Sequence, residues 1–187
     1  MSGKILIITG DGGESYESLY CVHRFREAGF EPWIAAPSKR RLHLVMHDFE
    51  PGWDTYKERD GYALAADLTF DAVQVDDYDA VVCLGGRAPE YLRNDPRVLA
   101  LVREFDRQQK WIFAICHGVQ IPAAAGLLEG RQACCYEHVR IDVENGGGIF
   151  NPQQAVRDGR IVTGATWQSH PEFYREVFSC LSSRVTA

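Results

Sequence analysis

Long hydrophobic segments, extended basic clusters and cysteine pairs with zinc-site spacing are all missing from this chain of 187 residues. No apolar run approaches the ~18 residues that span a bilayer, so we expect no contact with a membrane. The longest basic cluster is Lys39-Arg40-Arg41 and the formal net charge is -6, which disfavours nucleic acid as a partner. The six cysteines are scattered except for one adjacent pair, so we expect no metal site.

Signal-peptide features and linkers are missing as well. Met1 leads almost directly into a strand pattern, without a basic segment, an apolar stretch and a cleavage site. With the scattered cysteines, this favours a cytoplasmic protein that keeps its thiols reduced. The length suits one α/β domain with a full core and is too short for two, so we expect a single domain over residues 1–187.

Apolar runs and helical patterns alternate along the chain. Four runs have the composition of strands buried on both faces, at residues 4–9, 32–36, 79–84 and 111–115. Helical patterns lie at residues 16–28, 96–105, 117–126 and 171–181, and an Asp-Gly turn predicts a hairpin over 155–162. We also predict short strands at 132–136 and 139–143, and an irregular or hairpin-bearing insertion at 42–62. The alternation predicts a mostly parallel, doubly wound sheet with its ligand site at the carboxyl ends of the strands.

The clearest chemical signal lies where the run from Trp111 to Ile115 meets Cys116, His117 and Gly118. A buried strand that ends on a cysteine and turns into a helix has the pattern of a nucleophile elbow. The helix N-terminus would favour the thiolate. The alternative is that Cys116 is a small core residue. The side chain of His117 should point away from that of Cys116, and either a catalytic or a structural role fits it.

Two other strand ends carry candidate groups. Gly85 and Gly86 could let backbone N–H groups approach a substrate oxygen, or they could form an ordinary turn. Glu14 lies in the loop after the first strand and is either a solvated carboxylate or, if it faces Cys116, a proton partner of the thiol.

These residues belong to longer strings that resemble the ThiJ/PfpI (DJ-one) superfamily, in particular its PfpI-like intracellular protease branch. The resemblance covers nearly the whole chain. The strings that carry it are Gly13-Glu14-Ser15-Tyr16-Glu17, Asp67-Leu68-Thr69-Phe70-Asp71, Leu84-Gly85-Gly86-Arg87-Ala88-Pro89-Glu90, Ala114-Ile115-Cys116-His117-Gly118 and Gly126-Leu127-Leu128-Glu129-Gly130-Arg131. The Gly-Gly-Arg-Ala-Pro-Glu and Ile-Cys-His-Gly strings are the most specific.

The resemblance implies an α/β, flavodoxin-like sandwich of the class I glutamine amidotransferase type, with helices on both faces of the sheet. It implies that Cys116 is the nucleophile, that Glu14 hydrogen-bonds the cysteine and that His117 is the acid/base partner. Glu90 would orient His117 across the interface of a homodimer or a larger homo-oligomer. The N–H groups of Gly86 and His117 would bind the oxyanion, and no cofactor would be needed.

Two histidine patterns offer competing interpretations. His43 and His47 are four residues apart beside acidic residues, but the following Pro51 disfavours the helix that a metal site would need. His170-Pro171-Glu172 looks like the end of an amidotransferase triad, although the Cys-His-Gly string favours the PfpI-like arrangement. The stretch from His47 to Glu50 is similar to a glyoxalase III-like branch, so we expect the 42–62 insertion to form part of the pocket wall.

The leading functional hypothesis is a glyoxalase III-type reaction, in which methylglyoxal or glyoxal and water give a 2-hydroxy acid without glutathione. A cysteine peptidase acting on small peptides is the first alternative, because both reactions need a thiolate and oxyanion donors. The second is a redox-sensing or chaperone-like stress protein without turnover, since an exposed cysteine of low pKa oxidises readily. An amidotransferase-like hydrolase is a weaker option.

Overall fold

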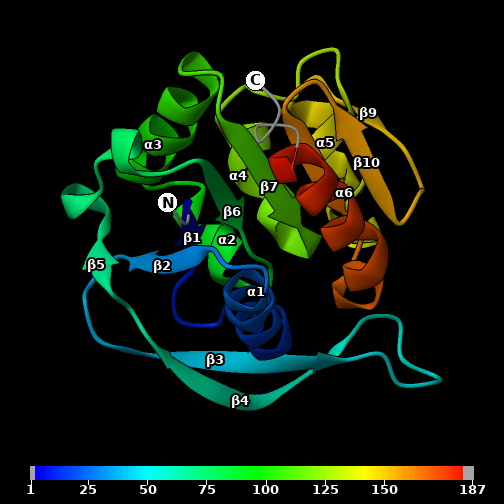
Figure 1. Ribbon diagram of the computed structural model, residues 1–187. Coiled ribbons are helices and arrows are strands. Elements are labelled where there is room, and N and C mark those ends of the chain that lie inside the picture. The colour runs from blue at the N-terminus through cyan, green and yellow to red at the C-terminus, as the bar shows by residue number, and fades with distance from the viewer. Residues whose placement is uncertain (1–2, 183–187) are drawn as a thin grey trace.

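A computed structural model describes residues 3–182 of the chain and contains a seven-stranded central sheet (Figure 1). Its strands, in spatial order, are β10 (Ala155–Asp158), β11 (Ile161–Gly164), β7 (Trp111–Ile115), β6 (Ala80–Cys83), β1 (Lys4–Ile8), β2 (Glu31–Ala36) and β5 (Leu68–Thr69). β10 pairs antiparallel with β11, and the other pairs are parallel. The predicted doubly wound sheet and the predicted hairpin at its edge are confirmed.

The central strands are buried because helices cover both faces of the sheet. Every residue of β6 and β7 is buried, as the continuous apolar runs predict. α1 (Ser15–Glu27) and α6 (His170–Ser182) lie side by side, and the rings of Phe25 and Phe178 are 5.5 Å apart. α3 (Pro96–Arg107) packs against β6, β7 and α4 (Gln120–Ala124).

The remaining helices are short: α2 (Ala88–Leu92), α5 (Arg140–Asn145) and the 3-10 turns η1 (Phe70–Ala72), η2 (Val75–Asp77), η3 (Cys116–Val119), η4 (Glu137–Val139) and η5 (Trp167–Ser169). Asp95 caps α3, because its carboxylate accepts the N–H of Arg97 at 3.0 Å. Across residues 3–182, no helix has both the length and the apolar character needed to cross a bilayer.

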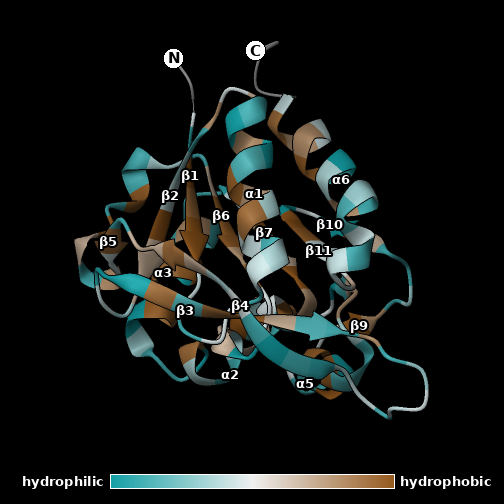
Figure 2. Cartoon of the chain, turned by 90° about the horizontal axis from the view of Figure 1, so that it is seen from below, coloured by the Kyte–Doolittle hydropathy of each residue, from teal (hydrophilic) through white to brown (hydrophobic). Residues whose placement is uncertain are grey.

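The 42–62 insertion forms a hairpin of β3 (Arg41–Asp48) and β4 (Lys57–Ala65), as predicted. Figure 2 shows this hairpin lying across the end of the molecule toward which β1 points. The N–H of Gly12 donates to the carbonyl of His43 at 2.8 Å, so the hairpin is fastened to the loop after β1. It therefore lies where the ligand site is expected.

The prediction of a strand over residues 139–143 is wrong, because this segment is helical in η4 and α5. Val139 and Val143 are four residues apart and both buried, whereas Ile141 between them is 57% exposed. That spacing puts the two valines on one face of a helix. The predicted strand at 132–136 is reduced to β8 (Gln132–Ala133), which pairs with β9 (Ile149–Phe150).

Candidate active site

Cys116 lies at a sharp turn between β7 and η3, at the carboxyl end of the sheet. Its φ of 58° is in the left-handed region, which costs a residue with a Cβ atom about 1 to 2 kcal/mol. Packing of the next turn holds this conformation, since a Cβ atom on Gly118 would come within 2.1 Å of the Cys83 carbonyl oxygen. The predicted elbow is therefore present, with a thiol residue that is 5% exposed.

Two backbone N–H groups approach the sulfur of Cys116. They belong to Gly86 and His117, and both act to lower the pKa of the thiol. Gly86 has a φ of 80°, and a Cβ atom there would lie 2.3 Å from the backbone nitrogen of Glu14, so this position requires glycine. The amides that the resemblance assigns to the oxyanion thus lie at the nucleophile, and their catalytic role stays a prediction.

The carboxyl group beside the thiol is that of Glu17, not Glu14 as the resemblance implies. Glu17 lies in the first turn of α1 and is fully buried. A Cβ atom on Gly85 would lie 2.7 Å from both the Cys116 Cβ and the Glu17 Oε2, so thiol and carboxyl flank the same small space. The Cys116 thiol is close enough to this carboxyl to act on its pKa as a hydrogen-bond donor, which lowers it.

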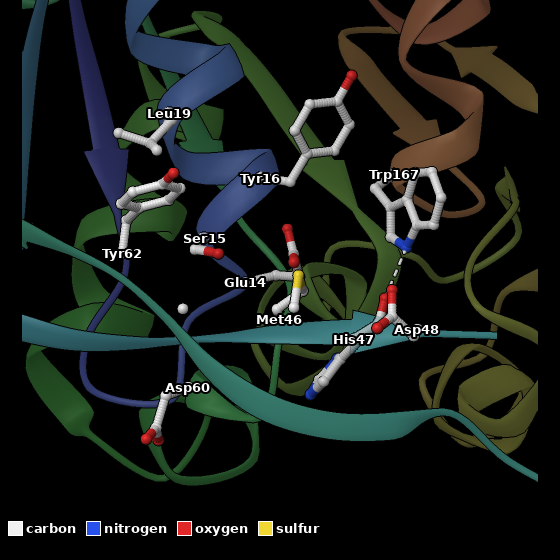
Figure 3. A pocket seen from close by; sticks show the side chains of 11 residues that line it. Glu14, Ser15, Tyr16, Leu19, Met46, His47, Asp48, Asp60, Tyr62 and Trp167 are labelled. Carbon is white, nitrogen blue, oxygen red and sulfur yellow. Dashed lines mark hydrogen bonds between the residues drawn. The ribbon is translucent and has the colours of Figure 1, made fainter. Parts of the chain in front are cut away.

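Glu14 instead caps α1. Its Oε2 accepts the N–H of Glu17 at 2.6 Å, because the residue just before a helix turns its side chain back to the free amides of the first turn. The carboxyl lies in a groove of about 620 Å³ between the start of α1 and the hairpin, lined by Glu14, Ser15, Tyr16, Leu19, Met46, His47, Asp48, Asp60, Gly61, Tyr62 and Trp167 (Figure 3). Cys116 is not among these lining residues.

Gly85 does not serve as a free donor for substrate, contrary to the prediction that both glycines do so. Its N–H donates to Oε2 of Glu17 at 2.7 Å. The carboxyl needs this bond because it is buried without a positively charged partner among the groups that shift its pKa. Gly85 therefore positions Glu17, and Gly86 alone of the pair offers its amide at the sulfur.

Burial raises the pKa of the Cys116 thiol well above its usual value, and the charge of Glu17 raises it further. The pKa of Glu17 is raised well above its usual range as well, first by burial and then by the charge of Glu14. The expectation of an exposed cysteine with a low pKa is therefore wrong, because desolvation outweighs the turn's amides. Two adjacent buried anions would repel, so the Cys116–Glu17 pair keeps at least one shared proton.

His117 contacts the thiol directly, whereas the sequence predicts that its side chain points away. Its Nδ1 lies 3.4 Å from the Cys116 sulfur, across the tight turn. Burial lowers the pKa of His117 to about 4, so the ring is neutral at pH 7 and can accept a proton. The charge of Asp142 acts in the opposite direction and raises the pKa of His117. The Asp142 carboxylate accepts hydrogen bonds from Arg93 and, at 3.0 Å, from Gln120.

Glu90 is exposed on α2, where it is free to meet another subunit. Within the described chain its charge acts on His47 and Tyr56, and it is not among the groups that shift the pKa of His117. The proposal that Glu90 orients His117 across an interface is compatible with this placement and stays a prediction.

Two tyrosine rings pack against His117, Tyr56 from the hairpin and Tyr136 from the segment between β8 and η4, and sequence reasoning missed both. Tyr56 meets the His117 ring edge-on at a centroid distance of 5.7 Å, and Tyr136 lies 5.2 Å from the same ring. His47 stacks on Tyr56 at 3.8 Å, and its Nε2 lies 3.0 Å from Oε2 of Glu58. The string His47 to Glu50 pointed to a pocket wall, but no pattern marked Tyr56.

The histidines of β3 are not arranged for a metal. A register shift between His43 and Val45 turns His43 outward, whereas His47 is buried. Residues 3–182 contain no group of three or more histidine, cysteine, aspartate or glutamate residues that could hold a metal ion.

His170 belongs to an aromatic cluster between α1 and α6. It stacks on Tyr20 at 4.5 Å and packs against Tyr16 and Tyr174. Both ring nitrogens are buried without a hydrogen-bond partner in the described part of the chain. The amidotransferase alternative would need this ring at Cys116, where the structure places His117 instead.

His170 should make the protein sensitive to acid. Burial lowers the pKa of His170 to about 4, so below pH 6.5 this residue binds a proton in the unfolded chain but not in the folded chain. Stability falls as the pH drops through this window, by about 3 kcal/mol for this residue at pH 4. The free energy of unfolding, measured with urea at pH 7 and pH 4.5, should therefore change less with pH in His170→Phe than in wild-type protein. Turnover at pH 7 should be retained, and an unchanged pH dependence would contradict the assignment.

Comparisons with known proteins identify the family of this chain. The model of the DJ-1/PfpI family matches residues 3–179. Protein DJ-1 homolog D of Arabidopsis thaliana is 40% identical over 98% of this chain and 49% of that protein, so the chain spans about half of that relative's length. Deglycase PfpI of Pyrococcus furiosus is 37% identical over 86% of this chain and 88% of that protein. A solved ThiJ/PfpI domain protein from Brachyspira murdochii superimposes with a TM-score of 0.83 at 24% identity, covering 97% and 98% of the two chains. The chain belongs to the DJ-1/PfpI family.

Proposed function

We propose that this protein converts small α-dicarbonyl compounds, such as methylglyoxal or glyoxal, into 2-hydroxy acids through a covalent adduct on Cys116. One observation carries the proposal. The buried Cys116 sulfur has the Glu17 carboxyl beside it, the His117 Nδ1 at 3.4 Å and the amides of Gly86 and His117 directed toward it. A nucleophile, two acid/base groups and oxyanion donors thus surround one reactive point.

The reaction begins when the sulfur bonds to the aldehyde carbon of methylglyoxal and the carbonyl electron pair moves to oxygen. The thiol proton passes to a basic group, for which His117 is neutral and adjacent, and the oxygen is protonated to give a hemithioacetal. The C1 proton is then removed and returned to C2 through an enediol, which leaves a thioester of lactate. Water cleaves the thioester and restores the thiol, so methylglyoxal and water give lactate with no net oxidation. Glutathione is not a reactant in this sequence.

The burial of Cys116 and His117 favours a small substrate over a peptide. Cys116 is 5% exposed and His117 is 4% exposed, so little of the reacting pair can be reached from solvent. A peptidase must seat several residues of an extended chain across its nucleophile, which needs an open groove. A three-carbon dicarbonyl needs only the space beside the sulfur.

Methylglyoxal consumption in the absence of glutathione tests the proposal. We expect purified protein to consume methylglyoxal and to form lactate in equal amount. Protein treated with iodoacetamide, with modification of Cys116 verified by mass spectrometry, should lose this activity. If unmodified protein with a reduced Cys116 forms no lactate, the proposal is wrong and peptide or amide substrates become the next to test.

Deglycase activity is a second candidate, favoured by the names of two relatives. Deglycase PfpI and the Protein/nucleic acid deglycase 2 of Escherichia coli are 37% and 32% identical to this chain. A deglycase would attack the adduct of a dicarbonyl with an amine or thiol, and would release the same 2-hydroxy acid. The initial rate measured with added amine distinguishes the two activities. If free methylglyoxal is the substrate, adding an excess of amine lowers the initial rate in proportion to the dicarbonyl that it captures, whereas a deglycase keeps or raises its rate.

A further inference from the structure

The ring of Tyr56 packs edge-on against the ring of His117, which contacts the Cys116 thiol. It belongs to the segment between β3 and β4, and it meets the His117 ring at 5.7 Å and an interplanar angle of 80°. The Nδ1 of His117 is 3.4 Å from the Cys116 sulfur. A substrate carbon bonded to that sulfur would therefore lie within the reach of a side chain that comes from the hairpin rather than from the elbow.

The hairpin holds Tyr56 in a defined position. His47 stacks on it at 3.8 Å with the planes inclined by 21°, and Tyr136 supports it at a ring distance of 5.7 Å. His47 is itself fixed, because Glu58 binds its Nε2 at 3.0 Å and also accepts from Nε of Arg87. A ring confined in this way can present its hydroxyl group without a further loss of conformational freedom.

The hydroxyl group of Tyr56 is available as a donor. No hydrogen bond of this group occurs within residues 3–182, whereas the hydroxyl of the neighbouring Tyr136 is engaged with Nδ1 of His138 at 2.8 Å. Burial, followed by the charges of Glu90 and Cys116, raises the pKa of Tyr56 to about 12, so it keeps its proton at pH 7. Of the two tyrosines that pack against His117, Tyr56 therefore has the unused hydroxyl group, and it is close enough to Cys116 for the charge of that residue to act on it.

We propose that Tyr56 donates a hydrogen bond to the second carbonyl oxygen of an α-dicarbonyl substrate and so selects dicarbonyls over simple aldehydes. This inference rests on the proposed function. One oxygen of the substrate becomes the oxyanion and meets the amides of Gly86 and His117. The other oxygen, on the adjacent carbon, is turned away from these amides and needs a separate donor. A simple aldehyde has no such oxygen and gains nothing from the hydroxyl group.

Protection of Cys116 against alkylation measures this preference without requiring turnover. Methylglyoxal and propanal both have three carbons and an aldehyde, and differ in the second oxygen. Each is titrated against alkylation of Cys116 by iodoacetamide, read by mass spectrometry, in wild-type protein and in Tyr56→Phe. We expect the variant to need roughly tenfold more methylglyoxal for half protection, while the propanal value stays within about twofold. The rate of alkylation without aldehyde should not change.

Tyr62→Phe is the matched control, since Tyr62 lies on the same hairpin and is 74% exposed. This control should behave as wild type with both aldehydes. Equal shifts for methylglyoxal and propanal in Tyr56→Phe, or no shift for either, would overturn the inference. The lactate assay and the protection assay test different claims. Wild-type protein that forms no lactate refutes the proposed function. The ratio of the half-protection concentrations in Tyr56→Phe and wild type still decides the role of Tyr56.

Discussion

Cys116→Ser and Glu17→Gln should each abolish the conversion of methylglyoxal, whereas Glu14→Gln should preserve it. The serine variant removes the nucleophile. Glu17→Gln keeps the size of the side chain and still offers an oxygen to the Gly85 amide, but it can no longer exchange a proton beside the thiol. Loss of a positioned acid/base group costs roughly 100-fold or more in rate. The measurement is kcat/KM for methylglyoxal, with the thiol content of each protein determined beforehand.

Glu14→Gln is the matched control for this change. A glutamine at the N-cap keeps an oxygen for the Glu17 amide, so α1 should remain capped and the rate should stay within a few-fold of wild type. A loss in Glu14→Gln as large as that in Glu17→Gln would return the catalytic carboxylate to the position that the family resemblance implies. Full activity in Glu17→Gln would remove the carboxyl from the mechanism.

Gly118→Ala should be among the most damaging single changes to the stability of this fold. The added Cβ atom would lie 2.1 Å from the Cys83 carbonyl oxygen and 2.7 Å from its carbon, both in the backbone at the end of β6. Neither atom can move without separating β6 from β7. We expect a loss of about 3 kcal/mol or more in the free energy of unfolding, measured by urea denaturation. Any folded protein should have lost activity, because the elbow shifts away from Gly86.

Gly126→Ala provides the comparison for that prediction. Gly126 has a φ of 76°, and a Cβ atom added there would meet no other atom within 4 Å, so alanine suffers backbone strain alone. The expected cost is about 1 to 2 kcal/mol, and turnover should persist. If Gly118→Ala is no more destabilising than Gly126→Ala, then β6 and β7 are less tightly packed at the elbow than the structure indicates.

The sheet and the turn at Cys116 could be predicted because their signals are local. The apolar runs at β1, β6 and β7 end at residues with distinct chemistry, and the cap at Asp95 is a short-range pattern. The strand predicted at Val139–Val143 failed because Val-Arg-Ile-Asp-Val alternates with period two and also puts its two valines on one helical face. Apolar period alone does not separate these alternatives over five residues.

The carboxyl group beside Cys116 was assigned to Glu14 instead of Glu17, because the correct residue depends on where α1 begins. Glu14 and Glu17 both follow the first loop, and a shift of the helix start would exchange cap and interior positions. Burial of Cys116 is likewise absent from its motif, so the sequence predicted a low pKa where the structure gives a raised one. Contact between Tyr56 and His117 joins residues 61 positions apart and has no local signal.

Under the proposed function, the residues that form bonds with the substrate and those that select it belong to different parts of the fold, because selection is assigned to the β3–β4 hairpin. The thiol and its amides come from the ends of β6 and β7, and the carboxyl group comes from the first turn of α1, all of which pack on the core. The hairpin is fastened from outside, through contacts such as that between Gly12 and His43 and that between the Trp167 indole and the His47 carbonyl at 3.1 Å. Under the proposed function, a substitution at Tyr56 would change which substrates are bound while the core that positions the cysteine stays unchanged.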